Sequence, residues 1–139
     1  MTDSIEIIDN PSQDDIQFLR DNLIENNRQF VGDQRRCPIA VFYRDQQHGR
    51  VGGCSGHTYG NWLYIEYLWV VSNQRGNGLG EQLLRSIEQA ASERGCHFVL
   101  LDTFSFQARP FYEKRGYSLI MTQEQCPTHH QRYYLTKRI

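Results

Sequence analysis

The fold of this chain is decided by residues 62–95, which read WLYIEYLWVVSNQRGNGLGEQLLRSIEQAASERG. Residues 62–71 are almost all apolar or aromatic, which is typical of a strand covered on both faces. From residue 79 onward, apolar residues recur at helical spacing, which predicts an amphipathic helix that ends near Gly95. The glycine-rich turn between them, residues 74–80, can bind a phosphate group, because free N–H groups and the positive end of the helix dipole face it.

The other elements predict a mixed α+β fold with one central sheet. Runs of branched and aromatic residues between turn signals predict strands at residues 5–8, 39–44, 50–57, 97–103, 117–121 and 132–136. Because a helix joins the strand at 62–71 to the strand at 97–103, we expect these two strands to be parallel neighbours. The sequence therefore predicts a twisted sheet of about six to seven strands with flanking helices, in one domain over residues 1–139.

Two further helices are predicted on either side of this central unit. The first begins at Ser12 or Asp14, which are good N-cap residues, and carries an apolar inner face made of Ile16, Leu19, Leu23 and Phe30. The second covers residues 106–115, with Pro110 in its first turn and Gly116 as its stop.

Composition excludes several classes of function. The chain has 139 residues and a formal net charge of -1, whereas a general nucleic-acid binder carries a basic excess. The N-terminus lacks the apolar core of a signal peptide, and no apolar run is long enough to span a membrane. The four cysteines form no C-x-x-C pair, which argues against a zinc site. We expect a cytoplasmic protein with no metal, no nucleic-acid partner and no membrane partner.

Three interpretations of the glycine turn compete. A P-loop is excluded, since no Gly-Lys-Ser or Gly-Lys-Thr follows the turn. A dinucleotide-binding fingerprint is nearer, because Asp102 ends the next strand where a ribose-binding acid would belong. However, Glu81 stands where the third glycine of that fingerprint is expected, and too few residues follow Asp102 for a second half of such a fold. The third interpretation is a tight turn that binds no ligand.

Two motifs together narrow the choice. The first is the run from Arg75 to Gly80, RGNGLG, which follows the apolar strand, and the second is the run from Phe111 to Tyr117, FYEKRGY. In this order and context they resemble the GNAT superfamily of N-acetyltransferases, over roughly residues 38–138. The resemblance implies a GNAT-like fold of three layers and acetyl-CoA as the acyl donor. It implies cofactor contacts from Leu68, Val70, Arg75, Gly76, Asn77, Gly78, Leu79, Gly80, Ser105 and Tyr112.

The resemblance also implies roles in the reaction. Residues 68–71 would part from the neighbouring parallel strand, so that the N–H group of Val70 can stabilise the thioester oxygen. Tyr112 would be the general acid for the departing thiolate, because a phenol stays protonated at neutral pH. Ser105 stands where the family often has asparagine, and Ser72 stands where it usually has proline.

Glu66 is the candidate general base. A strand period of two would put it on one face with Tyr64, Leu68 and Val70, beside the proposed oxyanion donor. A carboxylate among apolar neighbours needs a partner or a function, so a structural pair with an arginine or a tyrosine hydroxyl is the alternative. A proton relay through ordered water would also replace a direct base.

These inferences lead to one functional hypothesis and two rivals. The hypothesis is direct transfer of an acetyl group from acetyl-CoA to a primary amine of a small molecule or a protein, in a ternary complex. The rivals are a non-catalytic acyl-CoA sensor and a dinucleotide-binding oxidoreductase. Small polyamines, antibiotics, amino acids, and protein N-termini or lysines are all open as acceptors, and the resemblance implies that a homodimer is possible.

Overall fold

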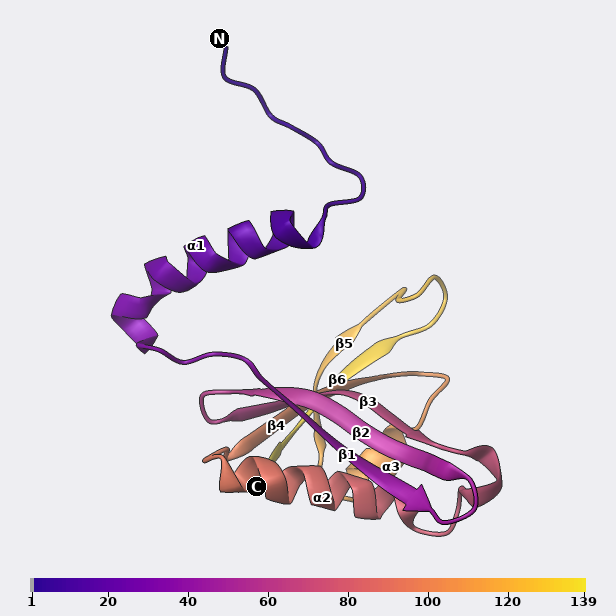
Figure 1. Ribbon diagram of the computed structural model, residues 1–139. Coiled ribbons are helices and arrows are strands. Elements are labelled where there is room, and N and C mark those ends of the chain that lie inside the picture. The colour runs from indigo at the N-terminus through magenta and orange to yellow at the C-terminus, as the bar shows by residue number, and fades with distance from the viewer. Residues whose placement is uncertain (1) are drawn as a thin grey trace. The chain divides into compact units, whose positions relative to one another are not determined.

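The computed structural model describes residues 2–139, which divide into two compact units, residues up to Gln34 and residues Arg35–Ile139 (Figure 1). The first unit contains helix α1 (Gln13–Val31). Its start at Ser12 confirms one of the two predicted caps: the Asp15 N–H donates to Ser12 Oγ at 3.1 Å, and the Ser12 N–H donates to Asp15 Oδ2 at 2.9 Å. This capping box satisfies two of the N–H groups that a helix leaves free at its first turn. No helix among residues 2–139 is both long and apolar enough to cross a membrane.

The prediction of a strand at residues 5–8 is wrong, because these residues have no regular secondary structure. The alternation of isoleucines gave a local signal for a strand, but a strand needs a hydrogen-bonded partner, and its own unit contains no other strand. The predicted apolar face of α1 likewise has nothing to pack against within a unit that contains a single helix.

The second unit contains one six-stranded sheet, which confirms the mixed α+β fold. Its strands are β1 (Cys37–Asp45), β2 (Gly49–Tyr59), β3 (Trp62–Val70), β4 (Phe98–Phe104), β5 (Ser118–Gln123) and β6 (Arg132–Arg138). The strand order is β1-β2-β3-β4-β6-β5. Strands β3 and β4 are parallel neighbours, as predicted, and the other pairs are antiparallel.

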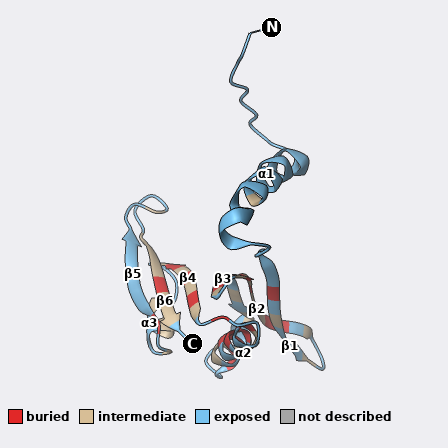
Figure 2. Cartoon of the chain, turned by 90° about the vertical axis from the view of Figure 1, so that its left-hand side faces the viewer, coloured by how far each residue is buried: buried red, intermediate tan, exposed pale blue. Residues whose placement is uncertain are grey.

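Helix α2 (Leu79–Glu93) lies along one face of the sheet (Figure 1). Figure 2 shows the buried residues gathered in this helix and in the strands that face it. The largest fully buried side chains include Leu63, Leu84, Ile87, Val99 and Leu135. The short helix α3 (Arg109–Glu113) is shorter than predicted, and its Phe111 and Tyr112 pack against the same core. A 3-10 turn, η1 (Ser72–Gln74), connects β3 to the glycine turn.

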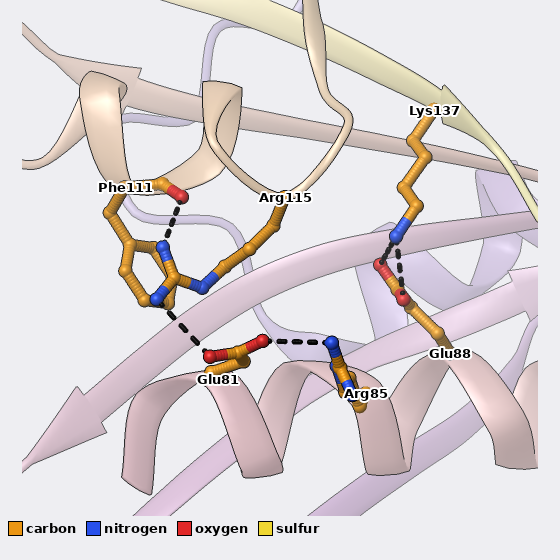
Figure 3. Close-up of polar contacts among 6 residues, drawn as sticks. All are labelled: Glu81, Arg85, Glu88, Phe111, Arg115 and Lys137. Carbon is orange, nitrogen blue, oxygen red and sulfur yellow. Dashed lines mark hydrogen bonds and ion pairs between the residues drawn. The ribbon is translucent and has the colours of Figure 1, made fainter. Parts of the chain in front are cut away.

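One charged residue of α2 lies within this core. Glu88 is a charged residue of this amphipathic helix, and it is only 8% exposed. Its carboxylate accepts a hydrogen bond from the Tyr117 hydroxyl at 2.6 Å. The carboxylate also pairs with Lys137 Nζ at 3.0 Å (Figure 3). Burial and this hydrogen bond raise the pKa of Tyr117. The buried carboxylate is therefore tolerated because it has two partners, one from the segment after α3 and one from β6.

Candidate functional site

The candidate site begins where β3 and β4 part. Their parallel pairing runs from Trp62 and Phe98 to Ile65 and Leu101 and stops there, although both strands continue. Beyond Ile65, β3 pairs only with β2. The predicted cover on both faces is not found: in the first half of β3 only the alternate residues Leu63 and Ile65 are buried, and no residue of the second half is. Tyr67 and Trp69 in the second half are 73% and 54% exposed.

The backbone of the unpaired half points into this opening. The Val71 N–H donates to the Val51 carbonyl of β2 at 2.8 Å. Because successive peptide groups of a strand point to opposite edges, the N–H and carbonyl groups of Val70 and Leu68 point away from β2 and toward β4. The opening that the family resemblance implied is therefore present in the structure, with these backbone groups along its edge.

A β-bulge shapes the same part of β3. Tyr67 pairs with Ser55 and Ile65 pairs with Gly56, which leaves Glu66 as the extra residue of β3. A Cβ atom on Gly56 would collide with the carbonyl oxygen of Tyr64, so only glycine fits opposite the bulge.

Because of this bulge, the side chain of Glu66 does not lie on the face that the sequence predicted. Leu68 and Val70 pack against the core, together with Ile65. The carboxylate of Glu66 instead lies beside His57, with Oε1 2.7 Å from Nδ1. The His57 ring stacks on Tyr64, at 5.0 Å between ring centroids. Glu66 therefore shares a face with Tyr64 but not with Leu68 or Val70. His57 is a residue that sequence reasoning missed, because the bulge that brings it to Glu66 depends on a glycine in another strand.

A cavity of about 490 Å³ lies on this face of the sheet, beside the opening. Its lining comes from β3, β4, β6 and the segment after β4, and includes Tyr64, Glu66, Tyr67, Asp102, Phe104, Gln107, Arg132 and Tyr134. Asp102, which the dinucleotide interpretation assigned to a ribose, pairs with Arg132 at 2.8 Å. The hydrogen bond to Asp102 raises the pKa of Arg132. Glu66 is therefore the carboxylate of this cavity that has no arginine partner among the described residues.

Tyr112, on α3, packs against the hydrophobic core. Its ring makes edge contacts with Phe111 and Tyr117, at 5.1 and 5.8 Å between centroids. Burial raises the pKa of Tyr112 to about 12, and the charges of Cys54 and Asp102 act in the same direction. Within residues 2–139 its hydroxyl has no hydrogen-bond partner. The side chain is therefore a protonated phenol at neutral pH with a donor to offer.

The glycine turn presents its N–H groups without partners from the described residues. Gly76 and Gly78 have φ angles of 86° and 80°, a region that favours glycine, and nothing lies within 4 Å of where a Cβ atom would be. No hydrogen bond within residues 2–139 involves the N–H groups of Gly76, Asn77 or Gly78. The first intrahelical hydrogen bond of α2 is from the Gln82 N–H to the Gly78 carbonyl, which leaves the N–H groups of its first turn free as well.

Arg75 connects this turn to the opening. Its Nε donates to the Val70 carbonyl at 2.8 Å. The terminal nitrogens of the guanidinium group make no hydrogen bond within the described chain. The turn, with its N–H groups and one fixed cation, can therefore bind a diphosphate directly beside the exposed end of β3.

Ser105 directly follows β4, and its hydroxyl oxygen already accepts a hydrogen bond. Its Oγ accepts a hydrogen bond from the Gln131 N–H at 3.1 Å, and its own N–H donates to the Gln131 carbonyl at 2.8 Å. These two bonds fix the segment before β6 to the end of β4. The hydroxyl proton of Ser105 remains available for a ligand.

Comparison with known proteins identifies relatives of this chain. Residues 4–117 match the family model of the acetyltransferase (GNAT) family. The chain is 36% identical over 111 residues to the blasticidin-S acetyltransferase of Streptomyces morookaense, which covers 78% of this chain and 82% of the relative. A crystal structure of an acetyltransferase from Bacillus cereus superimposes with a TM-score of 0.84 and 33% identity, over 96% of this chain and 98% of the other.

The fold is also shared with an aminoglycoside 6′-N-acetyltransferase solved in complex with coenzyme A. That structure has a TM-score of 0.66 and 21% identity, over 73% of this chain and 72% of the other.

Proposed function

The chain belongs to the GNAT acetyltransferase family, and on this premise we propose that it transfers an acetyl group directly from acetyl-CoA to a primary amine. The observation that carries the proposal is the parting of β3 and β4 beside a glycine turn with free N–H groups. These two features would hold the two ends of one donor molecule, its thioester and its diphosphate.

The diphosphate of acetyl-CoA would bind at the glycine turn. Gly76, Asn77 and Gly78 would donate their backbone N–H groups, and Leu79 and Gly80 would add the first N–H groups of α2. Arg75 would supply the fixed cation through its terminal nitrogens, since Nε is bonded to Val70. The positive φ angles of two glycines support this assignment, because they turn the peptide N–H groups toward one side without steric strain.

The pantetheine arm and the thioester would lie along the open edge of β3. Leu68 would pair with the arm as an added strand would, through the backbone groups that β4 leaves free. The N–H of Val70 would donate to the thioester oxygen as negative charge develops on it. Ser105 would contact the arm from the β4 side.

Three proton transfers accompany the reaction. An ammonium group first loses one proton to Glu66, which becomes neutral, and the free amine then attacks the thioester carbon. When the tetrahedral intermediate collapses, the C–S bond breaks, the thiolate takes a proton from Tyr112, and the Tyr112 phenolate takes the extra proton of the nitrogen. Glu66 then releases its proton to solvent. Tyr112 is suited to this donation because its raised pKa, about 12, keeps it protonated at neutral pH.

The acceptor would enter the cavity that Glu66 lines. The hydrogen bond from His57 supports a role for Glu66, because it fixes one carboxylate oxygen and leaves the other to face the amine. The names of the relatives, which include blasticidin-S and aminoglycoside acetyltransferases, suggest small-molecule amines as the first acceptors to test.

The proposal is tested in two steps with the full chain. Calorimetry with acetyl-CoA, and with NAD as the control ligand, measures donor binding. Incubation with acetyl-CoA and a panel of amines, with mass detection of the acetylated product, then identifies the acceptor. The panel includes blasticidin S, aminoglycosides, and peptides with a free N-terminus or a lysine. Acetyl-CoA binding without any product would favour the non-catalytic sensor, and no binding of acetyl-CoA would overturn the proposal.

A further inference from the structure

Glu81 stands at an unfavourable place for a protein that binds an anion at the glycine turn. It is the third residue of α2, directly after Gly80, so its backbone N–H belongs to the free first turn of the helix. A carboxylate there interacts favourably with the positive end of the helix dipole, and for the same reason it competes with a bound anion. The diphosphate site proposed above therefore carries a negative charge of its own.

Two arginines neutralise this carboxylate in the structure. Arg85 Nη2 lies 2.9 Å from Glu81 Oε1, and Arg115 Nη2 lies 3.4 Å from Oε2 (Figure 3). The Arg85 side chain is 76% exposed, so solvent and salt screen its pairing strongly. The Arg115 side chain is 25% exposed and makes further contacts, so it is the better-held of the two cations.

Arg115 is fixed by Phe111 of helix α3. Its Nη1 donates to the Phe111 carbonyl at 2.8 Å, and its guanidinium carbon lies 4.0 Å from the centroid of the Phe111 ring (Figure 3). The same ring faces the last glycine of the turn, since a Cβ atom on Gly80 would lie 3.4 Å from its Cζ. Arg115, Phe111 and the first turn of α2 therefore form one packed unit.

We propose that Arg115 is a positioning residue for coenzyme A binding, which acts by neutralising Glu81 at the first turn of α2. The proposal rests on the diphosphate site of the proposed function. It adds that the affinity of this site depends on a residue of the segment after α3, which does not itself touch the diphosphate. The alternative is that Arg115 only ties α3 to α2 and has no electrostatic effect on the ligand.

A double-mutant cycle separates the two roles, with coenzyme A as the probe and calorimetry as the measurement. In Arg115→Met the carboxylate of Glu81 keeps only the exposed and screened Arg85 as its partner, and we expect the Kd for coenzyme A to rise roughly three- to tenfold at low salt. The loss should shrink at high salt. In Glu81→Gln/Arg115→Met the Kd should return to within about twofold of the wild-type value, because the carboxylate that Arg115 compensated is gone. Glu81→Gln alone should bind coenzyme A as tightly as the wild type or more tightly.

The matched control is Arg109→Met, which removes an arginine of α3 that pairs with Glu113 instead of Glu81. It should leave the Kd unchanged, and thermal melts of all variants check that each is folded. An unchanged Kd in Arg115→Met would overturn the proposal. A Kd raised as much by Glu81→Gln as by Arg115→Met would also overturn it, because only a mechanical tie between the helices predicts that result. If the wild-type protein fails to bind coenzyme A at all, the proposed function falls and this inference falls with it.

Discussion

The two halves of β3 have similar sequences and opposite surroundings. Residues 62–65 have strands on both sides, and Leu63 and Ile65 are buried. Residues 67–70 pair with β2 alone, and Tyr67 and Trp69 are exposed. The difference shows that one strand can supply both the core and the site, and that the change occurs at a single bulged residue, Glu66.

The comparison predicts that the first half determines stability. Leu63→Ala removes a fully buried side chain and should lower the free energy of unfolding by about 2–5 kcal/mol. Tyr67→Ala, in the second half, removes a side chain that is 73% exposed and should change it by less than about 0.5 kcal/mol. Urea unfolding measures both. Equal losses in the two variants would mean that the second half of β3 is as well packed as the first.

The glycine turn next to the second half should determine donor binding. Gly78→Glu would place a carboxylate at the proposed diphosphate site, and we expect the Kd for acetyl-CoA to rise at least a hundredfold. The new side chain has free space around it, so the fold should survive the strain of a positive φ angle, at a cost of about 1–2 kcal/mol. Calorimetry and a thermal melt test this. Retained affinity would remove the diphosphate site from the turn.

Tyr112 tests the chemistry at the opening. Tyr112→Phe removes the hydroxyl and keeps the ring, so kcat should fall at least about tenfold while the Kd for acetyl-CoA stays within twofold. Steady-state kinetics with the best acceptor of the panel measure this effect. Full turnover in this variant would end the role of Tyr112 as the general acid.

The raised pKa of Tyr112 gives the same variant an independent readout. A phenol whose pKa is higher in the folded state than in the unfolded state favours folding at pH values below about 10. That contribution is lost as the pH rises toward about 12, the pKa of Tyr112 in the folded protein. The free energy of unfolding of the wild-type protein should therefore fall between about pH 10 and pH 12, and that of Tyr112→Phe should fall less. An identical decline in both proteins would show that Tyr112 is not the buried group.

Glu66 is expected to have the smallest effect at neutral pH. Glu66→Gln should lower kcat a few-fold at neutral pH and more at acidic pH, where a larger share of the amine carries a proton. The ratio of wild-type to variant rates across pH measures this dependence. Glu113→Gln is the control, because that carboxylate pairs with Arg109 on α3. A constant ratio would indicate that ordered water carries the proton.

The sequence predicted those features that depend on local signals. The parallel pairing of β3 and β4 followed from the amphipathic helix between them, and the turn followed from its glycines and the strand before it. The resemblance of residues 75–80 and 111–117 to motifs of one family predicted the fold correctly. The roles of the individual site residues stay predictions.

The features that the sequence did not predict depend on residues far apart in the chain. Glu66 changes face because of a bulge that Gly56 of β2 permits, and nearly every residue around Glu66 is apolar, so the pattern contains no sign of the change. The pairing of Glu66 with His57 was missed for the same reason. The strand expected at residues 5–8 failed in the opposite way, because a clear local pattern found no partner.

The position of the two tryptophans gives this strand a consequence for spectroscopy. Trp62 begins β3 and stacks on Phe98 at 4.9 Å, whereas Trp69 lies next to Val70, whose carbonyl receives the side chain of Arg75. The chain contains no other tryptophan. We expect the fluorescence of Trp69 to change when a donor fills the turn, while that of Trp62 changes only when the sheet melts. Within the nine residues of β3, Trp69 would therefore report on donor binding and Trp62 on unfolding of the sheet.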